Sequence, residues 1–214
     1  MRKIDKTKIL SVKYKEWVDK LSHDDKEHPR HSAYYDDIVM NLLHCQKGVC
    51  AYTEMPLCNT GLLSKNNWKN GRYVHKSPEV IGELDHFNPQ VKKNKYWEWQ
   101  NLFVVLERVN RRKGAKEVDD ILKPDSPGYD PDVLLEYNEK ANVFIPHTEI
   151  KNKTIRKRIK DMIDVLQINY NFVRNERGKF LKKVFKKREM DQPVEIDCFF
   201  TAYQMTLAAK EETE

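Results

Sequence analysis

The sequence predicts a mostly helical α+β protein, and two observations lead to this fold class. Several stretches place apolar residues three and four positions apart, which is typical of helices with one buried face. A few short apolar runs bounded by turn residues are typical of strands, and they are too few for a large sheet. We therefore expect short strands and a helix in the middle of the chain, with N- and C-terminal helices around them.

The length of 214 residues is sufficient for a sizeable core and fits one domain. We expect a single domain over residues 1–214, made of three parts. Residues 1–44 form N-terminal helices, residues 45–125 form the central core with an insertion, and residues 126–214 form a hairpin followed by basic helices.

The composition favours a folded, basic protein. Hydrophobic residues are 39% and charged residues 34% of the chain, which also has four Trp and ten Tyr. The formal charge of +6 and the pI of about 9.0 favour a polyanionic partner, although a soluble basic surface gives the same values. No apolar run is long enough to cross a bilayer, and the first residues lack the apolar core of a signal peptide. We expect a cytoplasmic protein without a membrane partner, whose four cysteines are reduced: Cys45, Cys50, Cys58 and Cys198.

Two helices are predicted before residue 45, one within residues 8–21 and one over about residues 32–44. The first has an apolar stripe made of Ile9, Val12, Trp17, Val18 and Leu21. The polar stretch between the helices holds His23, His28 and His31 among acidic residues. A metal site is conceivable there, but the spacing matches no ligand pattern, so we favour a solvated charged loop.

The middle of the chain alternates turns with apolar runs. Residues 46–53 predict a turn into a short strand, and residues 56–78 predict an irregular insertion rich in Asn, Lys and Gly. Residues 80–87 have the apolar content of a strand. The segment from Tyr96 is the most apolar of the chain and predicts a turn, a strand and the entry to a helix near Glu107.

The C-terminal part predicts a loop, a hairpin and basic helices. Three prolines within residues 123–131 exclude regular structure there, and residues 134–137 and 141–146 read as two strands of a hairpin. Thr154 is a good N-cap for a helix with an apolar stripe, Ile155, Ile159, Met162 and Leu166, and a basic face, Arg156, Lys157, Arg158 and Lys160.

A second basic helix is predicted over residues 171–187, with lysines outward. Its inward residues are Phe172, Val173, Phe180, Leu181 and Val184. We expect residues 194–209 to be helical and residues 210–214 to be frayed.

One stretch of the sequence carries chemistry. Asp85-His86 ends a predicted strand, Asn101 precedes the next strand, and Asn110 lies in the helix beside a cluster of cations. Cutting a phosphodiester bond needs an activated water and neutralisation of the developing charge. A histidine takes a proton from water near pH 7, and oxygen ligands hold a hard cation. Because neighbours on a strand point to opposite sides, Asp85 and His86 have separate tasks, and both can act at one site only if the strand is distorted or ends there, which Phe87-Asn88-Pro89 permits. This set of residues, a histidine base with oxygen ligands and nearby cations, indicates a metal-dependent phosphodiesterase.

The pattern from Asp85-His86 through Asn101 to Asn110 resembles the HNH (ββα-metal) endonuclease family. The resemblance implies a β-hairpin and a helix that clamp one divalent ion. It implies that His86 is the general base, that Asp85 and Asn110 are metal ligands, and that Asn101 orients the base by holding the hairpin loop. An amide oxygen at position 110 is consistent with Mg²⁺ or Mn²⁺ more than with a soft metal.

The residues beside these positions have open roles. Glu83 shares the strand face of Asp85 and could be an additional or water-mediated ligand. Arg111, Arg112 and Lys113 follow Asn110 directly, and Arg112 or Lys113 is expected to contact a phosphate. Alternatively, these three are simple cations of a helix surface.

A structural zinc site is not expected, although many relatives carry one made of two cysteine pairs. Here Cys50 matches one of the four positions, whereas Thr53, Leu106 and Val109 occupy the others. Tetrahedral zinc needs four soft or imidazole ligands, so we expect Leu106 and Val109 to pack in a small apolar core instead. A different arrangement would pair Cys50 with Cys45 and Cys58, and we do not favour it.

A wider similarity covers about half of the chain. It includes residues 82–89, 97–114 and 120–125, the hairpin near Leu135, Thr154-Ile155, and residues 166–169 before Arg177. These segments resemble the HNH nuclease subunit of Septu-type anti-phage systems and of related retron-linked nucleases. The resemblance implies an antiviral nuclease that is partnered by an ATPase subunit and held in check by it.

Three functions stay open on the sequence alone. The first is a metal-dependent endonuclease that acts on DNA and whose basic C-terminal helices grip phosphates without reading sequence. The second is a catalytically inactive or RNA-directed nucleic-acid-binding subunit of a defence complex, built on the same scaffold. The third is a structural subunit whose aromatic residues only form a core, which explains Trp97 and Trp99 but not Asp85-His86.

Overall fold

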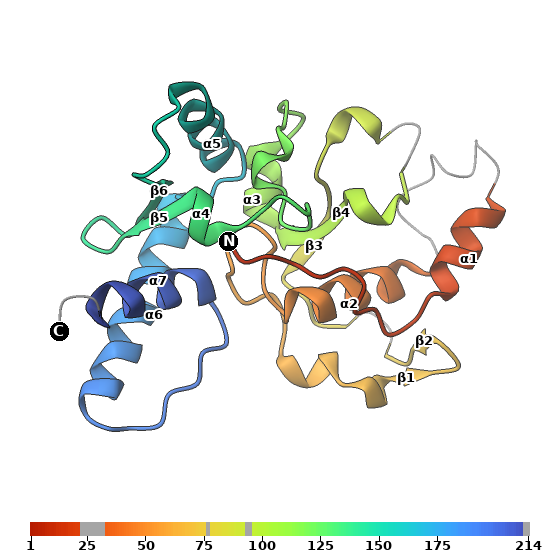
Figure 1. Ribbon diagram of the computed structural model, residues 1–214. Helices are drawn as coiled ribbons and strands as arrows, with labels where there is room; N and C mark the ends of the chain where they lie inside the picture. The colour runs from red at the N-terminus through yellow and green to blue at the C-terminus, as the bar shows by residue number, and fades with distance from the viewer. Residues whose placement is uncertain (22–32, 76–77, 93–95, 212–214) are drawn as a thin grey trace. The chain divides into compact units, whose positions relative to one another are not determined.

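In the described residues the named strands pair as two-stranded antiparallel hairpins, and helices precede and follow them along the chain (Figure 1). The computed structural model describes residues 1–21, 33–75, 78–92 and 96–211. The strands are β1 (Trp68–Lys69), β2 (Arg72–Tyr73), β3 (Gly82–His86), β4 (Leu102–Leu106), β5 (Leu135–Asn138) and β6 (Val143–Pro146). The helices are α1 (Lys13–Lys20), α2 (Tyr35–Gln46), α3 (Glu107–Lys113), α4 (Pro131–Leu134), α5 (Lys153–Val165), α6 (Asn171–Glu189) and α7 (Phe200–Glu211). The predicted α+β class is confirmed.

The chain forms two compact units. The central unit comprises residues 4–51 and 56–118, and the C-terminal unit comprises residues 1–3, 52–55 and 119–214. The expectation of one domain over residues 1–214, and of its three parts, stays a prediction. Within the described ranges, no helix is both long and apolar enough to cross a membrane.

Strand β4 is the interior of the central unit, because all five of its residues are buried. It pairs with β3 along one edge, with Leu84 opposite Val104. Its other edge is held by the buried side chain of Gln46 at the end of α2, which donates to the Val104 carbonyl at 2.8 Å and accepts from the Val104 amide at 2.9 Å. Both backbone groups of Val104 are therefore satisfied, and β4 is fixed between β3 and α2.

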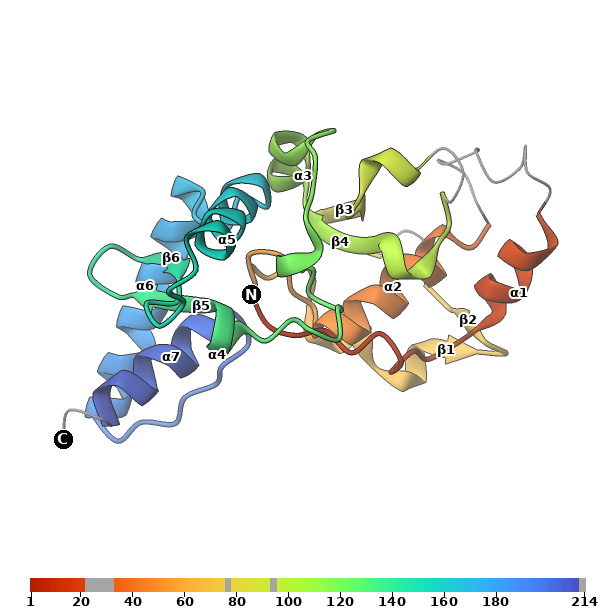
Figure 2. The same cartoon turned by 45° about the horizontal axis from the view of Figure 1, so that its top comes forward.

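The strand, strand and helix predicted around the motif are observed. Strand β3 ends at His86, the 3-10 turn η5 (Trp99–Asn101) leads into β4, and α3 begins at Glu107 directly after it (Figure 2). The prediction was accurate here because the apolar run 102–106 is unbroken and is followed at once by charged residues.

The predicted stripe of the first helix is wrong in part. Helix α1 begins at Lys13, later than expected, and its buried residue is Tyr14, whereas Val12 is 50% exposed. The ring of Tyr14 packs on Trp99, with 5.2 Å between ring centroids. A tertiary contact with a distant aromatic residue therefore decides which face of α1 is buried. The polar stretch with His23, His28 and His31 lies outside the described residues.

Two further expectations for the central part need correction. In residues 46–53 the predicted turn is observed at Lys47 and Gly48, which both have positive φ, but the predicted strand is only an isolated bridge between Val49 and Pro56. The strand does not continue because the chain turns again at residues 51–53. The predicted irregular stretch 56–78 contains the short hairpin of β1 and β2. Asn70 and Gly71 between these strands both have positive φ, as a tight hairpin turn requires.

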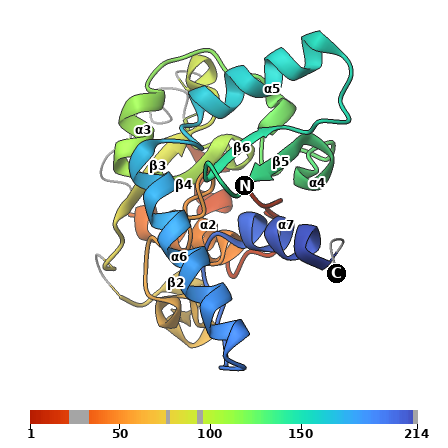
Figure 3. The ribbon, with the colours of Figure 1, turned by 90° about the vertical axis from the view of Figure 1, so that its left-hand side faces the viewer.

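In the C-terminal unit, the hairpin of β5 and β6 is as predicted, and it packs between α5 and α7 (Figure 3). Buried Arg177 of α6 ties this hairpin to the helix. Its guanidinium donates to the carbonyl of Asn142 at 2.7 Å and lies over the Phe144 ring at 4.8 Å. Gly178 is needed beside it, because a Cβ there would lie 2.8 Å from the side chain of Asn142.

Helix α5 has the predicted apolar stripe, since Ile159, Met162 and Leu166 are buried. The predicted N-cap is wrong: Asn152, not Thr154, caps the helix by accepting from the amides of Thr154 and Ile155. Both residue types form caps, and the helix begins at the earlier one.

Helix α6 extends to Glu189, two residues beyond the prediction. Of the residues expected to face inward, Val173, Leu181 and Val184 are buried, whereas Phe172 is 39% exposed. Helix α7 begins at Phe200, later than the expected 194, and continues to Glu211.

Candidate active site

The candidate site lies on β3, β4 and α3 of the central unit. Strands β3 and β4 pair in antiparallel register, which sets Asp85 opposite Phe103 and His86 opposite Leu102. Glu83 and Asp85 are two residues apart, so both side chains lie on the same face of β3, and His86 lies on the other. The hairpin thus separates the two acids from the imidazole.

Helix α3 contacts the face of β3 that carries the two acids. Asn110 donates from Nδ2 to Oε1 of Glu83 at 2.9 Å, and Lys113 donates from Nζ to Oδ1 of Asp85 at 3.0 Å. Residues three apart share a helix face and residues two apart share a strand face, so the two contacts form a short ladder. The structure therefore brings together Glu83 with Asn110 and Asp85 with Lys113.

The pair of Asp85 and Lys113 is buried. The side chain of Asp85 is 5% exposed and that of Lys113 is 0% exposed. Lys113 also donates to the backbone carbonyl of His86 at 2.7 Å. Removing one partner of such a pair leaves an uncompensated buried charge, which costs about 3–5 kcal/mol. Lys113 thus fixes both the Asp85 carboxylate and the end of β3.

The imidazole of His86 is held by a backbone carbonyl. Its Nε2 lies 2.7 Å from the oxygen of Tyr96, and the two rings contact edge to face with 4.4 Å between centroids. A carbonyl only accepts, so Nε2 carries the hydrogen and the neutral ring keeps its lone pair on Nδ1. The hydrogen bond therefore selects Nδ1 as the basic nitrogen.

The surroundings of His86 keep the ring neutral. Burial lowers the pKa of His86 to about 4, and the positive charges of Lys92 and Lys113 act in the same direction, whereas the bond to Tyr96 opposes them. At neutral pH the imidazole is thus in the form that accepts a proton.

Asn101 closes the loop that follows His86. Its side chain accepts from the amide of Asn88 at 2.8 Å and donates to the carbonyl of Asn88 at 3.0 Å. The backbone carbonyl of Asn101 accepts from the amide of Phe87 at 2.8 Å. These are the contacts that a loop-holding residue needs, and the effect of Asn101 on catalysis stays a prediction.

A buried lysine supports the same loop from the N-terminal segment. Lys6 donates from Nζ to the carbonyl of Trp99 at 3.0 Å and to that of Gln100 at 3.2 Å. Its ammonium also lies 3.6 Å from the centroid of the Phe103 ring. Lys6 therefore fixes the turn that presents Asn101.

The residues that could hold a metal offer oxygen atoms: the carboxylates of Asp85 and Glu83 and the amide of Asn110. Among the described residues, no three side chains of His, Cys, Asp or Glu lie together as a metal site. The candidate set is therefore two carboxylates and one amide, and such oxygen donors fit a hard cation such as Mg²⁺ or Mn²⁺. The ammonium of Lys113 already neutralises Asp85, so it would repel a second cation and lower its affinity.

The three cations after Asn110 have different surroundings. Arg111 and Arg112 are exposed, and Arg111 forms an ion pair with Glu107 one turn earlier. Their phosphate contacts stay a prediction. Lys113, which was expected to be available to a phosphate, is buried and bonded within the unit, because its side chain lies on the strand side of α3.

The zinc-site positions of this unit are apolar or bonded to the backbone. Leu106 is 8% exposed and Val109 is 0% exposed, so both pack in the core as expected. The sulfur of Cys50 accepts from the amide of Leu106 at 3.4 Å. All four cysteines are free thiols.

Sequence reasoning missed several partners of the site. The Tyr96 carbonyl has no side-chain signal, and Lys6 is distant in sequence. The role of Lys113 had a signal, since it lies three residues after Asn110 and therefore shares its helix face. Asn88 likewise stands two residues after His86, where a loop-closing partner is needed.

No protein-family model matches this chain, and no curated protein matches it in sequence.

Proposed function

We propose that this chain is a metal-dependent endonuclease of the HNH type that hydrolyses phosphodiester bonds in DNA. One observation carries the proposal. His86 is a neutral imidazole at the end of β3, with Nε2 bonded to a carbonyl and the lone pair on Nδ1. Such a ring has Nδ1 unprotonated at neutral pH and can accept a proton from water, which is the first requirement of phosphodiester hydrolysis. Its pKa of about 4 makes it a weaker base than an unperturbed histidine, so the proposed function needs the pKa to rise when the phosphate and the metal are bound.

The arrangement of the hairpin and helix supports the HNH assignment. Two antiparallel strands are followed directly by a helix, and the paired Asp85-His86 ends the first strand. Asn110 projects from the helix toward the strand face that carries Glu83 and Asp85. Asn101 ties the loop beside His86.

In this proposal each residue has one task. His86 takes the proton from the attacking water at Nδ1, and Asn101 with Lys6 holds the loop that orients it. Asp85 and Asn110, with Glu83 as an additional ligand, would hold Mg²⁺ or Mn²⁺. Because Asp85 and His86 lie on opposite faces of β3, they can serve one phosphate only at the end of the strand, which is where His86 stands. When bound, such a cation supplies the charge neutralisation that the pentacovalent phosphate and the leaving oxygen need. Arg111 and Arg112 neutralise neighbouring phosphates from the exposed side of α3.

The biological setting follows from the resemblance of the sequence. We propose a cytoplasmic effector of an anti-phage defence system, partnered by an ATPase subunit that restrains the nuclease.

The test is cleavage by the purified chain. Supercoiled plasmid, single-stranded DNA and RNA are each incubated with Mg²⁺, with Mn²⁺ and with a chelator. We expect nicking and linearisation of the plasmid with either metal and none with the chelator. Cleavage of no substrate by the folded protein, alone or with its ATPase subunit, would overturn the proposal.

Replacement of the proposed ligands tests the metal site separately. Asp85→Asn and Asn110→Ala are expected to weaken Mn²⁺ binding, measured by calorimetry, and to recover part of their cleavage rate at high Mg²⁺. Unchanged Mn²⁺ affinity in both variants would remove these residues from the site.

A second candidate function is a catalytically inactive or RNA-directed nucleic-acid-binding subunit on the same scaffold. The contact between Lys113 and Asp85 favours it, because the carboxylate most needed for the metal is already neutralised. The two functions are separated by the metal titration: an inactive subunit binds nucleic acid equally well with and without Mn²⁺ and shows no metal-binding heat.

A further inference from the structure

The C-terminal unit has two long basic helices, and they use their cations differently. Sequence alone assigns a lysine- and arginine-rich outer face to both α5 and α6. The structure distinguishes cations that are neutralised inside the unit from cations that are not. A group of cations of the second kind lies on α6, which belongs to a different unit from the candidate active site.

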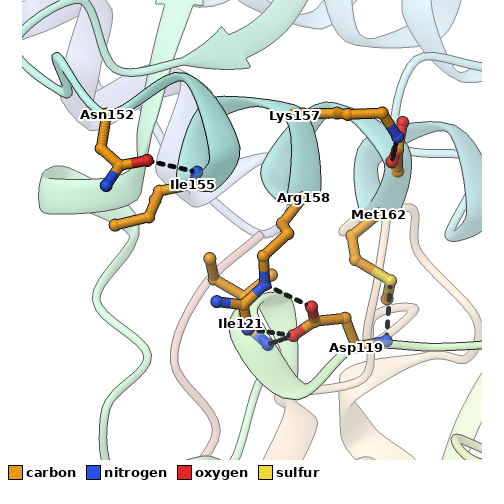
Figure 4. Close-up of polar contacts among 8 residues, drawn as sticks. Asp119, Ile121, Asn152, Ile155, Lys157, Arg158 and Met162 are labelled. Carbon is orange, nitrogen blue, oxygen red and sulfur yellow. Dashed lines mark hydrogen bonds and ion pairs between the residues drawn. The ribbon is translucent and has the colours of Figure 1, made fainter.

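Three of the five cations of α5 bond within the unit (Figure 4), whereas Lys153 and Lys160 are exposed and stand seven residues apart. Arg158 forms a two-pronged ion pair with Asp119, at 2.6 and 2.8 Å. Lys157 pairs with Asp161 one turn later at 2.5 Å. Arg156 donates to the backbone carbonyl of His147 at 2.8 Å. These side chains are therefore poor candidates for holding a polyanion.

Helix α6 keeps a stripe of lysines exposed. Within the described part of the chain, Lys182, Lys183 and Lys186 are exposed and have no ion pair or hydrogen bond to a side chain. Their neighbours differ, because Lys179 pairs with Glu176 at 2.8 Å and Arg188 donates to the hydroxyl of Tyr203 at 2.6 Å. We call Lys182, Lys183 and Lys186 the α6 lysine stripe.

The α6 lysine stripe lies on one face of the helix. At about 100° per residue, its three positions fall within an arc of about 100°. The buried residues Val173, Leu181 and Val184 fall on the opposite side of the helix. The stripe therefore faces solvent while the apolar side of α6 is used by the core.

Like charges one turn apart weaken an isolated helix, and Lys182 and Lys186 are such a pair. The unit thus maintains an arrangement that disfavours its own helix when no anion is present. A partner that supplies several closely spaced negative charges removes this repulsion.

We propose that the α6 lysine stripe binds the phosphate backbone of nucleic acid. Lysines act as point charges without a fixed hydrogen-bonding plane, so they suit contacts that position a backbone without reading bases. An anionic membrane is a poorer fit, because a helix that lies in the lipid interface inserts an apolar face, and the apolar face of α6 is buried. The binding does not require cleavage, so it stands apart from the chemistry proposed for His86.

The test compares two triple variants that lose the same charge. One is Lys182→Gln, Lys183→Gln and Lys186→Gln. The control is Lys151→Gln, Lys157→Gln and Lys179→Gln, whose lysines pair with Glu149, Asp161 and Glu176. Binding of a labelled duplex is measured with a chelator present, over a series of salt concentrations, so that no cleavage occurs. Circular dichroism verifies that both variants keep their helices.

We expect the stripe variant to bind about tenfold more weakly or worse near physiological salt. The slope of log Kd against log salt should fall by about 2.7, since each phosphate contact on duplex DNA contributes about 0.9. The control variant should stay close to the parent protein. Equal loss in both variants would show that net charge alone is responsible and would overturn the proposal.

Two further arms separate other outcomes. Vesicles with anionic lipid test the membrane alternative, and binding there that depends on the stripe while duplex binding does not would also overturn the proposal. Plasmid cleavage with Mg²⁺ is measured in parallel. If the stripe variant binds duplex as tightly as the parent and the parent cleaves plasmid, only this inference is rejected. If duplex binding depends on the stripe and the parent cleaves no plasmid, only the proposed function is rejected.

Discussion

The last turns of α3 and α6 both carry consecutive cations, yet only α3 buries one of them. In α3, Lys113 is 0% exposed and bonds to Asp85 and to the carbonyl of His86. In α6, Lys186 is exposed and faces solvent. A run of basic residues at a helix end therefore does not indicate how its charges are used. The decisive factor is whether the opposing surface offers a carboxylate.

The physical origin of this difference lies in the elements that each helix packs against. Helix α3 lies on a strand face that carries Glu83 and Asp85, so Asn110 and Lys113 meet acids there, beside the buried Val109. Helix α6 packs through Val173, Leu181 and Val184, so the lysines of the α6 lysine stripe lie on its outer face. Lys113 of α3 is thus held in a fixed geometry, whereas the lysines of the α6 lysine stripe are exposed.

The largest expected effect tests this comparison directly. Lys113→Met leaves Asp85 charged and buried, and we expect it to lower the free energy of unfolding by about 3–5 kcal/mol. Lys186→Met also removes a cation from the last turn of a helix, and we expect a change within about 0.5 kcal/mol. Urea denaturation of both variants measures the difference. Similar losses in the two would contradict the contrast between α3 and α6.

The neutral part of the hairpin network should give the next largest effect. Asn101→Ala leaves the amide and carbonyl of Asn88 without their side-chain partner, which we expect to cost about 1–3 kcal/mol. The matched control is Asn66→Ala, an exposed asparagine of the same unit. If Asn101→Ala unfolds at the same urea concentration as the control, the loop is held by other contacts.

A smaller effect is expected at the start of α5. Asn152→Ala should destabilise the C-terminal unit by about 1 kcal/mol, because it removes the acceptor of two helix amides. Thr154→Ala should change little, since that side chain is not the cap. A larger loss of stability in Thr154→Ala than in Asn152→Ala would show that Thr154 is the cap, as the sequence predicts.

The smallest effect concerns the ion pair between Asp119 and Arg158, which tests whether Arg158 of α5 is neutralised inside the unit. Hydrogen bonds from Arg158 hold the pKa of Asp119 below 3.8, outweighing its partial burial. A carboxylate with a lowered folded pKa stabilises the fold above its unfolded pKa, and this contribution is lost as the pH falls through the folded value. Asp119→Asn should therefore be less stable than the parent at neutral pH and converge with it in acid. A constant difference across the pH range would argue against the pair.

The sequence predicts the elements around the motif well and their partners poorly. The apolar run 102–106, followed at once by Glu107, defines β4 and the start of α3 because both signals are local. The burial of Tyr14 in place of Val12 depends on Trp99, which is distant in sequence. Periodicity identifies a helix but not which neighbour it meets.

The candidate site shows the same limit. Asp85, His86, Asn101 and Asn110 are identifiable by residue type and spacing. The sequence does not show that Nδ1 of His86 is the basic nitrogen, because this depends on the backbone carbonyl of Tyr96. The assignment of Lys113 to phosphate also differs from its observed position, because burial against Asp85 is a property of how α3 meets β3.

The most direct test of the proposed function is the cleavage rate of His86→Ala. The parent and the variant are compared on supercoiled plasmid with saturating Mg²⁺, with duplex binding and circular dichroism measured on the same preparations. His75→Ala, an exposed histidine of the same unit, is the control. We predict that His86→Ala loses about 10²- to 10⁴-fold in rate while fold and binding are kept, and that the control is unchanged. Nicking by His86→Ala at the parent rate would contradict the central claim.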